Sequence, residues 1–206
     1  ALLDKLTPIV LNWSEIAEEY GVEMFCPLNE PQILAYKNDN DVSAWAKDIL
    51  PKIRRRYNGK LVFEVQGAKD HLYNLTGYDY VADGGFTSTK DIADHPEWIE
   101  EMINEEFLAL KLNYPGFKYI FFNAGAFTGP DYYWWEPIAI ENMKNNSEGW
   151  PDDFFTVSFE SQADFYNIFF NITWTEVDGY FLPVYKGWEY RNKPAEKVIR
   201  QWFKQP

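Results

Sequence analysis

The chain has 206 residues, and its 19 Lys and Arg against 32 Asp and Glu give a formal net charge of −13. This charge argues against a nucleic-acid partner or an anionic membrane surface, because both need a basic patch. The single cysteine, Cys26, excludes a disulfide framework and a zinc site built on cysteines. The apolar runs are too short for a transmembrane helix, and with two histidines we expect no metal and no cofactor.

Hydrophobic periodicity and the positions of Pro and Gly predict helices that alternate with strands. The first helix ends at Gly21, and its main part is expected to begin at Pro8, the position that proline favours. The remaining predicted elements, in chain order, are strand 22–28, a helix from the N-cap Ser43 to about Asn58, strand 60–65, strand 78–82 ending at Gly84 and Gly85, a helix from Pro96 to about Pro115, strand 117–122, a polar and aromatic loop over about 126–158, helix 160–173, strand 179–184, and a helix near Pro194.

Strand–helix alternation at this spacing predicts an α/β fold built from parallel βαβ units. A complete (β/α)₈ TIM barrel needs eight strands and typically about 250 residues, whereas the sequence predicts five strands. An open doubly wound sheet would carry a Gly-rich loop after its first strand, but Leu28-Asn29-Glu30-Pro31 occupies that place. We therefore predict one domain over 1–206: the C-terminal part of a TIM barrel, strands four to eight, lacking the first three βα units and carrying a long loop after strand seven.

Asn29-Glu30-Pro31 directly follows a buried strand, which is where barrel enzymes place catalytic groups. The stretch from Glu15 to Pro31 resembles strand four of the clan A glycoside hydrolases, a group of β-mannanase-like and cellulase-like TIM barrels. Three later segments, Ser161–Tyr166, Val177–Phe181 and Asn192–Ala195, resemble the closing part of such barrels. The resemblance implies that Glu30 is the general acid and then the general base, and that Asn29 contacts a sugar 2-hydroxyl.

A retaining mechanism also needs a second carboxylate, about 5–5.5 Å away, as the nucleophile. In the family this is a Glu at the end of strand seven, three βα units or about 90 residues after the acid/base. Here that place falls on Asn123, in Phe121-Phe122-Asn123-Ala124-Gly125. Asn cannot form the glycosyl-ester intermediate, so Asn123 is assigned to substrate binding instead.

Three explanations for this departure stay open. The chain is a catalytically silent relative that binds glycan, or the nucleophile comes from elsewhere, or the strand-seven register differs or the substitution was engineered. For the second explanation we favour Glu136, in Tyr133-Trp134-Trp135-Glu136-Pro137. Asp83, at the end of the predicted strand six, is a further candidate, and its structural interpretation is a cap on the Gly84-Gly85 turn.

Aromatic residues make up 19% of the chain, which suits a protein that stacks on sugar rings as well as one with a large aromatic core. Trp135, beside Trp134 in the long loop, and Tyr185 and Trp188, after the last strand, are the predicted sugar platforms. The remaining tryptophans singled out lie on apolar helical faces and are expected in the core: Trp13, Trp45, Trp98 and Trp202.

The resemblance and these residues predict a retaining O-glycosyl hydrolase acting on a β-linked mannan or glucan, with Glu30 and Glu136 as the catalytic pair. The alternative is a silent glycan-binding barrel. The expected partner is a carbohydrate, with no nucleic acid and no membrane, and a second chain or an upstream segment would complete the barrel. A polymeric substrate favours a secreted or cell-surface location.

Overall fold

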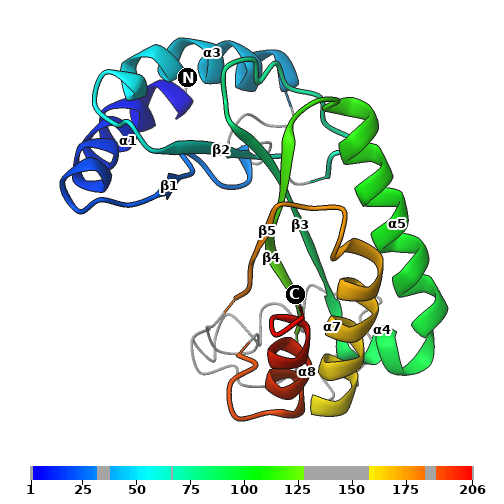
Figure 1. The fold of residues 1–206 in the computed structure, drawn as a ribbon. Coiled ribbons are helices and arrows are strands. Elements are labelled where there is room, and N and C mark those ends of the chain that lie inside the picture. Colours follow the sequence, from blue (N-terminus) through cyan, green and yellow to red (C-terminus); the bar gives the residue numbers. More distant parts are fainter. Residues whose placement is uncertain (1, 32–37, 66, 128–157, 184–188, 206) are drawn as a thin grey trace, which may run out of the picture. The chain divides into compact units, whose positions relative to one another are not determined.

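The computed structural model describes residues 2–31, 38–65, 67–127, 158–183 and 189–205, with the backbone alone at 85–88, 90, 123 and 127. Helices and strands alternate along most of this length (Figure 1). In chain order they are α1 (Leu2–Glu19), β1 (Met24–Phe25), α3 (Asp39–Arg54), β2 (Lys60–Glu64), β3 (Tyr80–Ser88), α4 (Thr89–Asp94), α5 (Pro96–Asn113), β4 (Lys118–Phe127), α7 (Phe159–Thr173), β5 (Gly179–Phe181) and α8 (Pro194–Trp202).

The chain forms two compact units, and three segments make up each of them. The first unit contains 1–84, 105–122 and 177–180, and the second contains 85–104, 123–176 and 181–206. The first unit therefore holds α1, β1, α3 and β2 and the first residues of β3, β4 and β5. The single domain over 1–206 stays a prediction.

The five strands form one sheet in the order β1-β2-β3-β4-β5, which confirms the predicted α/β class. β1 and β2 pair in parallel with Met24 opposite Lys60, and β2 and β3 pair in parallel with Val62 opposite Tyr80. In a parallel sheet the carboxyl ends of neighbouring strands meet at one edge. The residues that follow β1 and β2 therefore lie at the same edge of the sheet.

Successive residues of a strand point to opposite faces of the sheet, and in the first unit the two faces pack against different hydrophobic clusters. Leu61, Phe63 and Val81 belong to the main hydrophobic core, together with the buried residues of α1 and α3. Val62 and Ala82 belong instead to a smaller cluster on the other face, against which the Cys26, Met24, Tyr80 and Phe122 side chains pack. We call these the helix-covered face and the inner face.

α1 begins at Leu2 and contains Pro8 in its interior, so the predicted start at Pro8 is wrong. Tertiary packing explains the longer helix. Leu3 is 2% exposed, and the indole N–H of Trp45 donates a hydrogen bond of 3.0 Å to Thr7 Oγ1, so α3 holds the turn that precedes Pro8. α3 itself begins at Asp39 rather than after Ser43, because Asn38 accepts hydrogen bonds from the first N–H groups of the helix.

The buried face of α1 is not the one that the sequence pattern predicts. Val10 and Ala17 are buried, whereas Trp13 is 57% exposed, so the prediction that Trp13 lies in the core is wrong. Trp45 is 5% exposed, which confirms its predicted place in the core.

β3 and β4 both extend beyond their predicted ends. β3 continues through Gly84 and Gly85 to Ser88, and the short helix α4, which the sequence analysis missed, follows it directly. Glycine weakens a strand but does not stop one whose backbone is held by neighbouring strands. β4 continues to Phe127, five residues beyond its predicted end at Phe122.

An aromatic cluster lies between α7 and α8 in the second unit. Phe170 contacts Trp202 and Phe203 at centroid distances of 5.9 and 5.8 Å, and Trp174 lies 5.0 Å from Phe203. Trp202 is thus partly buried in this cluster. Trp98 is 56% exposed and stacks on the His95 ring, so its predicted place in the core is wrong.

Candidate active site

Glu30 lies five residues after the end of β1, at the carboxyl edge of the sheet. Its φ is +50°, in the left-handed region that residues other than glycine rarely adopt. Its backbone N–H donates a hydrogen bond of 2.6 Å to a carboxylate oxygen of Glu64. The structure therefore joins the segment after β1 to the end of β2 at this residue.

Glu64 is the last residue of β2 and is fully buried. It alternates with Phe63 and shares the phase of Val62, which places it on the inner face of the sheet. The sequence analysis did not assign Glu64 to the site. The sequence offered one signal for it: Glu64 and Gln66 are two residues apart in a strand, so their side chains point to the same face. Gln66 lies outside the described residues.

Cys26 ties the same segment at a second point. Its thiol donates a hydrogen bond of 3.1 Å to the Leu28 carbonyl. Burial, opposed by the Leu28 contact and assisted by the charge of Glu64, raises the pKa of the Cys26 thiol to about 12. The thiol is therefore neutral at physiological pH and acts as a partly buried polar packing group.

Asp83 shares the phase of Val81 and so belongs to the helix-covered face, away from Glu64. Its carboxylate accepts hydrogen bonds from the backbone N–H groups of Gly67 and Ala68, both at 3.0 Å, and of Gly84 at 2.8 Å. Burial raises its pKa to about 6 against these bonds. Asp83 thus holds the loop after β2. It does accept the Gly84 N–H, but Gly84 and Gly85 continue β3, so the turn that it was expected to cap is not there.

A second polar group at this edge joins α3 to the loop after β2. Nδ1 of His71 lies 2.9 Å from an Asp39 carboxylate oxygen, and the other oxygen accepts the Leu72 N–H. The Tyr73 ring stacks on the His71 ring, and its hydroxyl is buried without a hydrogen-bond partner among the described residues. Sequence reasoning missed this contact, since the partners lie 32 residues apart.

The other predicted site residues are only partly within the described chain. Asn29 is exposed beside Glu30. Asn123 lies in β4, with its backbone alone described. The remaining predicted site residues, Glu136, Trp135, Tyr185 and Trp188, lie outside the described residues, as does most of the predicted long loop.

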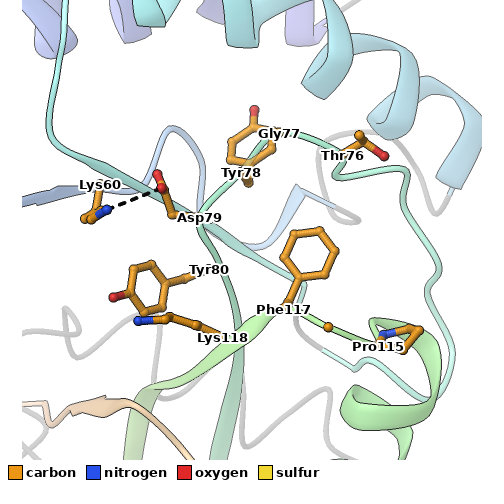
Figure 2. Close-up of a pocket in the computed structure, with 10 residues that line it drawn as sticks. Lys60, Thr76, Gly77, Tyr78, Asp79, Tyr80, Pro115, Phe117 and Lys118 are labelled. Carbon is orange, nitrogen blue, oxygen red and sulfur yellow. Dashed lines mark ion pairs between the residues drawn. The ribbon is translucent and has the colours of Figure 1, made fainter.

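A cavity of about 490 Å³ lies at the opposite ends of the strands, where β2, β3 and β4 begin. Figure 2 shows Lys60 paired with Asp79 at this cavity, and Lys118 beside the Tyr80 ring. The Lys118 ammonium lies 5.5 Å from the centre of that ring. Of the predicted site residues that the structure describes, none lines this cavity, and it belongs to the end of the sheet away from Glu30.

Within the described part of the chain, no group of His, Cys, Asp and Glu side chains is arranged to hold a metal ion. None of the helices seen over the same residues is both long and apolar enough to cross a membrane.

The sequence matches no protein-family model, and no curated protein matches it at a significant level. Solved structures do match. Two of a GH113 β-1,4-mannanase, one of them a complex, align over 99% of this chain, with TM-scores of 0.63 and 0.64 and 16% and 18% identity. The GH113 β-mannanase of Alicyclobacillus acidocaldarius, in complex with ManMIm, aligns over 98% of the chain with a TM-score of 0.62 and 16% identity.

The chain spans 63% of the length of the first two of these structures and 61% of the third. At this level of identity the likeness concerns the fold and carries no residue roles across. The chain therefore has an α/β fold similar to part of a GH113 TIM barrel.

Proposed function

We propose that this chain is the C-terminal part of a glycoside hydrolase that cleaves β-linked mannan by a retaining mechanism, with Glu30 as its acid/base. The observation that carries the proposal is the position of Asn29-Glu30-Pro31 in the segment after β1, at the carboxyl edge of a parallel sheet, with Glu30 five residues beyond the end of the strand. The activity of the structural neighbours, β-1,4-mannanase, suggests the substrate class.

In this mechanism the Glu30 carboxyl first gives its proton to the glycosidic oxygen as the bond to the leaving sugar breaks. The resulting carboxylate then takes a proton from the water that hydrolyses the glycosyl-enzyme intermediate. Asn29 lies beside Glu30 and is exposed, so its amide is free to approach a sugar hydroxyl. Glu136 is the proposed nucleophile, and Asn123, Trp135, Tyr185 and Trp188 are proposed to bind the sugar.

The chain spans 63% of the length of two of its structural neighbours. We propose that an upstream segment or a second chain supplies the strands that complete the barrel.

The second candidate function is a catalytically silent, glycan-binding barrel. It is favoured by Asn123, which lies in β4 and stands where the resemblance stated above expects the nucleophile Glu. This candidate predicts affinity for oligosaccharides that is lost in Trp135→Ala or Trp188→Ala, without hydrolysis.

The test is reducing-end release from a panel of β-mannans and β-glucans, with Glu30→Gln run beside the parent. We expect activity on mannan that falls by about 10²- to 10⁴-fold in the variant, the usual contribution of a general acid/base. Circular dichroism of both proteins is the control for folding. Full activity in a folded Glu30→Gln protein contradicts the role of Glu30, whereas sugar binding without hydrolysis in the parent favours the silent barrel.

A further inference from the structure

The backbone of Glu30 is held in a conformation that its own sequence disfavours. A φ of +50° is uncommon for any residue with a Cβ atom. Pro31 follows, and a proline restricts the preceding residue to extended conformations because its ring crowds that residue's backbone. Such a conformation persists only when neighbouring structure fixes it.

Glu64 supplies a contact that fixes it. The distance of 2.6 Å from the Glu30 nitrogen to the Glu64 carboxyl oxygen is short for an N–H donor. Glu64 is fully buried, so water does not compete for this hydrogen bond. A bond of this kind tolerates little displacement of the donor.

Glu64 is itself set in a rigid part of the first unit. It is paired within the parallel ladder, opposite Ala82 of β3. Its neighbour Phe63 is fully buried and contacts the Tyr78 ring edge-on at 5.2 Å. On the other side of the bond, the Cys26 thiol fixes the Leu28 carbonyl two residues before Glu30. The sheet thus fixes the position of the Glu30 backbone.

We infer that Glu64 is a positioning residue for the acid/base Glu30, an inference that rests on the proposed function. By holding the Glu30 N–H, the Glu64 carboxylate keeps the Cα of Glu30 in the one backbone conformation that directs its side chain at the glycosidic oxygen. Proton transfer requires the two heavy atoms to lie within hydrogen-bond distance. Releasing the N–H lets Glu30 and Pro31 relax to extended conformations and moves the carboxyl away.

The first experiment measures the contact itself. The exchange rate of the Glu30 amide proton is followed by NMR in the parent, Glu64→Gln and Glu64→Leu. Gln keeps an acceptor oxygen at the same reach, whereas Leu has a similar volume and no acceptor. We expect slow exchange in the parent and in the Gln variant, and fast exchange in the Leu variant. Slow exchange in a folded Leu variant overturns the inference.

The second experiment measures kcat and KM on mannan for the same proteins. We expect Glu64→Leu to lower kcat by about a hundredfold with KM little changed, because a displacement of about 1 Å has an effect of this size. Glu64→Gln should recover much of the loss. Asp79→Asn is the matched control, since Asp79 also accepts a backbone N–H, that of Leu61 at 2.8 Å, but at the amino end of β3.

The outcomes separate the two proposals. A loss of kcat in Glu64→Leu that only follows its folded fraction, as in the Asp79→Asn control, overturns the positioning role. If the parent releases no reducing ends at all, the hydrolase proposal fails. The Glu30 amide exchange then still decides whether Glu64 holds the backbone of Glu30, because it does not depend on turnover.

Discussion

Two aspartates four residues apart, one just before β3 and one inside it, have different surroundings. Asp79 immediately precedes the strand, and its side chain is 28% exposed. It accepts a hydrogen bond of 2.6 Å from the Arg54 guanidinium and lies 3.7 Å from the Lys60 ammonium. Asp83 is 1% exposed and is held by backbone N–H groups, with no cation paired to it among the described contacts.

The pKa values of these two carboxyls move in opposite directions. Burial acts to raise the pKa of Asp79, but the Leu61 N–H and the Arg54 side chain outweigh it, and the pKa is lowered. For Asp83 burial dominates the N–H groups of Ala68 and Gly67 and raises the pKa to about 6. Asp79, at the amino end of the sheet, is thus balanced by cations. Asp83, farther toward the carboxyl end, is held by backbone hydrogen bonds alone among the described contacts.

The largest effect is expected from Asp83→Ala. It leaves the N–H groups of Gly67, Ala68 and Gly84 without their acceptor, and one of these bonds is buried and two are partly buried. An unsatisfied buried donor costs about 1 to 3 kcal/mol, so we expect the free energy of unfolding to fall by about 3 to 4 kcal/mol after partial relaxation. Urea denaturation followed by circular dichroism measures this change.

The comparison for that experiment is Asp79→Ala, which removes one backbone bond and a partly exposed ion pair. We expect a loss of about 1 to 2 kcal/mol. Equal losses for the two variants would mean that the two aspartates contribute equally to stability despite their different surroundings.

A smaller effect is expected in the pH dependence of stability. Because the pKa of Asp83 is raised from 3.8 to about 6 by folding, the folded state binds this proton more readily than the unfolded state. Its contribution to stability is therefore complete below about pH 4 and is lost as the pH rises through about 6. Asp79, whose pKa is lowered, contributes in the opposite sense, with stability lost as the pH falls.

The measurement is the difference in unfolding free energy between the parent and Asp83→Asn at pH 4 and at pH 7. Two pKa units correspond to roughly 2 to 3 kcal/mol, so the difference should shift by that amount in favour of the parent at pH 4. Asp79→Asn is the control and should shift the other way. A difference for Asp83→Asn that does not vary with pH would contradict the raised pKa.

Most of the helices and strands followed from the sequence because their signals are local. Pro96 and Pro194 mark the first residues of α5 and α8, as predicted, and the apolar run at 60–65 gives β2. The position of Glu30 after the first strand was likewise predictable. Such signals depend on neighbours within one turn of helix or one strand, which the sequence displays directly.

The contacts that define the site were not predictable, since their partners lie far apart in the chain. The bond from Glu30 to Glu64 spans 34 residues, and the left-handed backbone at Glu30 depends on it, although Pro31 argues for an extended conformation. The buried face of α1 was predicted wrongly for a related reason. Its periodicity indicates an apolar stripe, but packing against α3 selects Leu3 and Val10.

The smallest effect is expected from Lys60→Met at the amino end. The Lys60 side chain is 60% exposed, and its ammonium lies 3.7 Å from an Asp79 oxygen, whereas Arg54 lies 2.6 Å from the other. Exposed ion pairs contribute little, so the unfolding free energy should fall by less than about 0.5 kcal/mol. The loss should shrink further at about 1 M salt, where charges are screened within a few ångströms.

Arg54→Met is the matched variant: it also removes a hydrogen bond to the Gly59 carbonyl and should cost more at either salt concentration. Equal costs for the two variants would mean that both cations, and not Arg54 alone, balance the Asp79 charge.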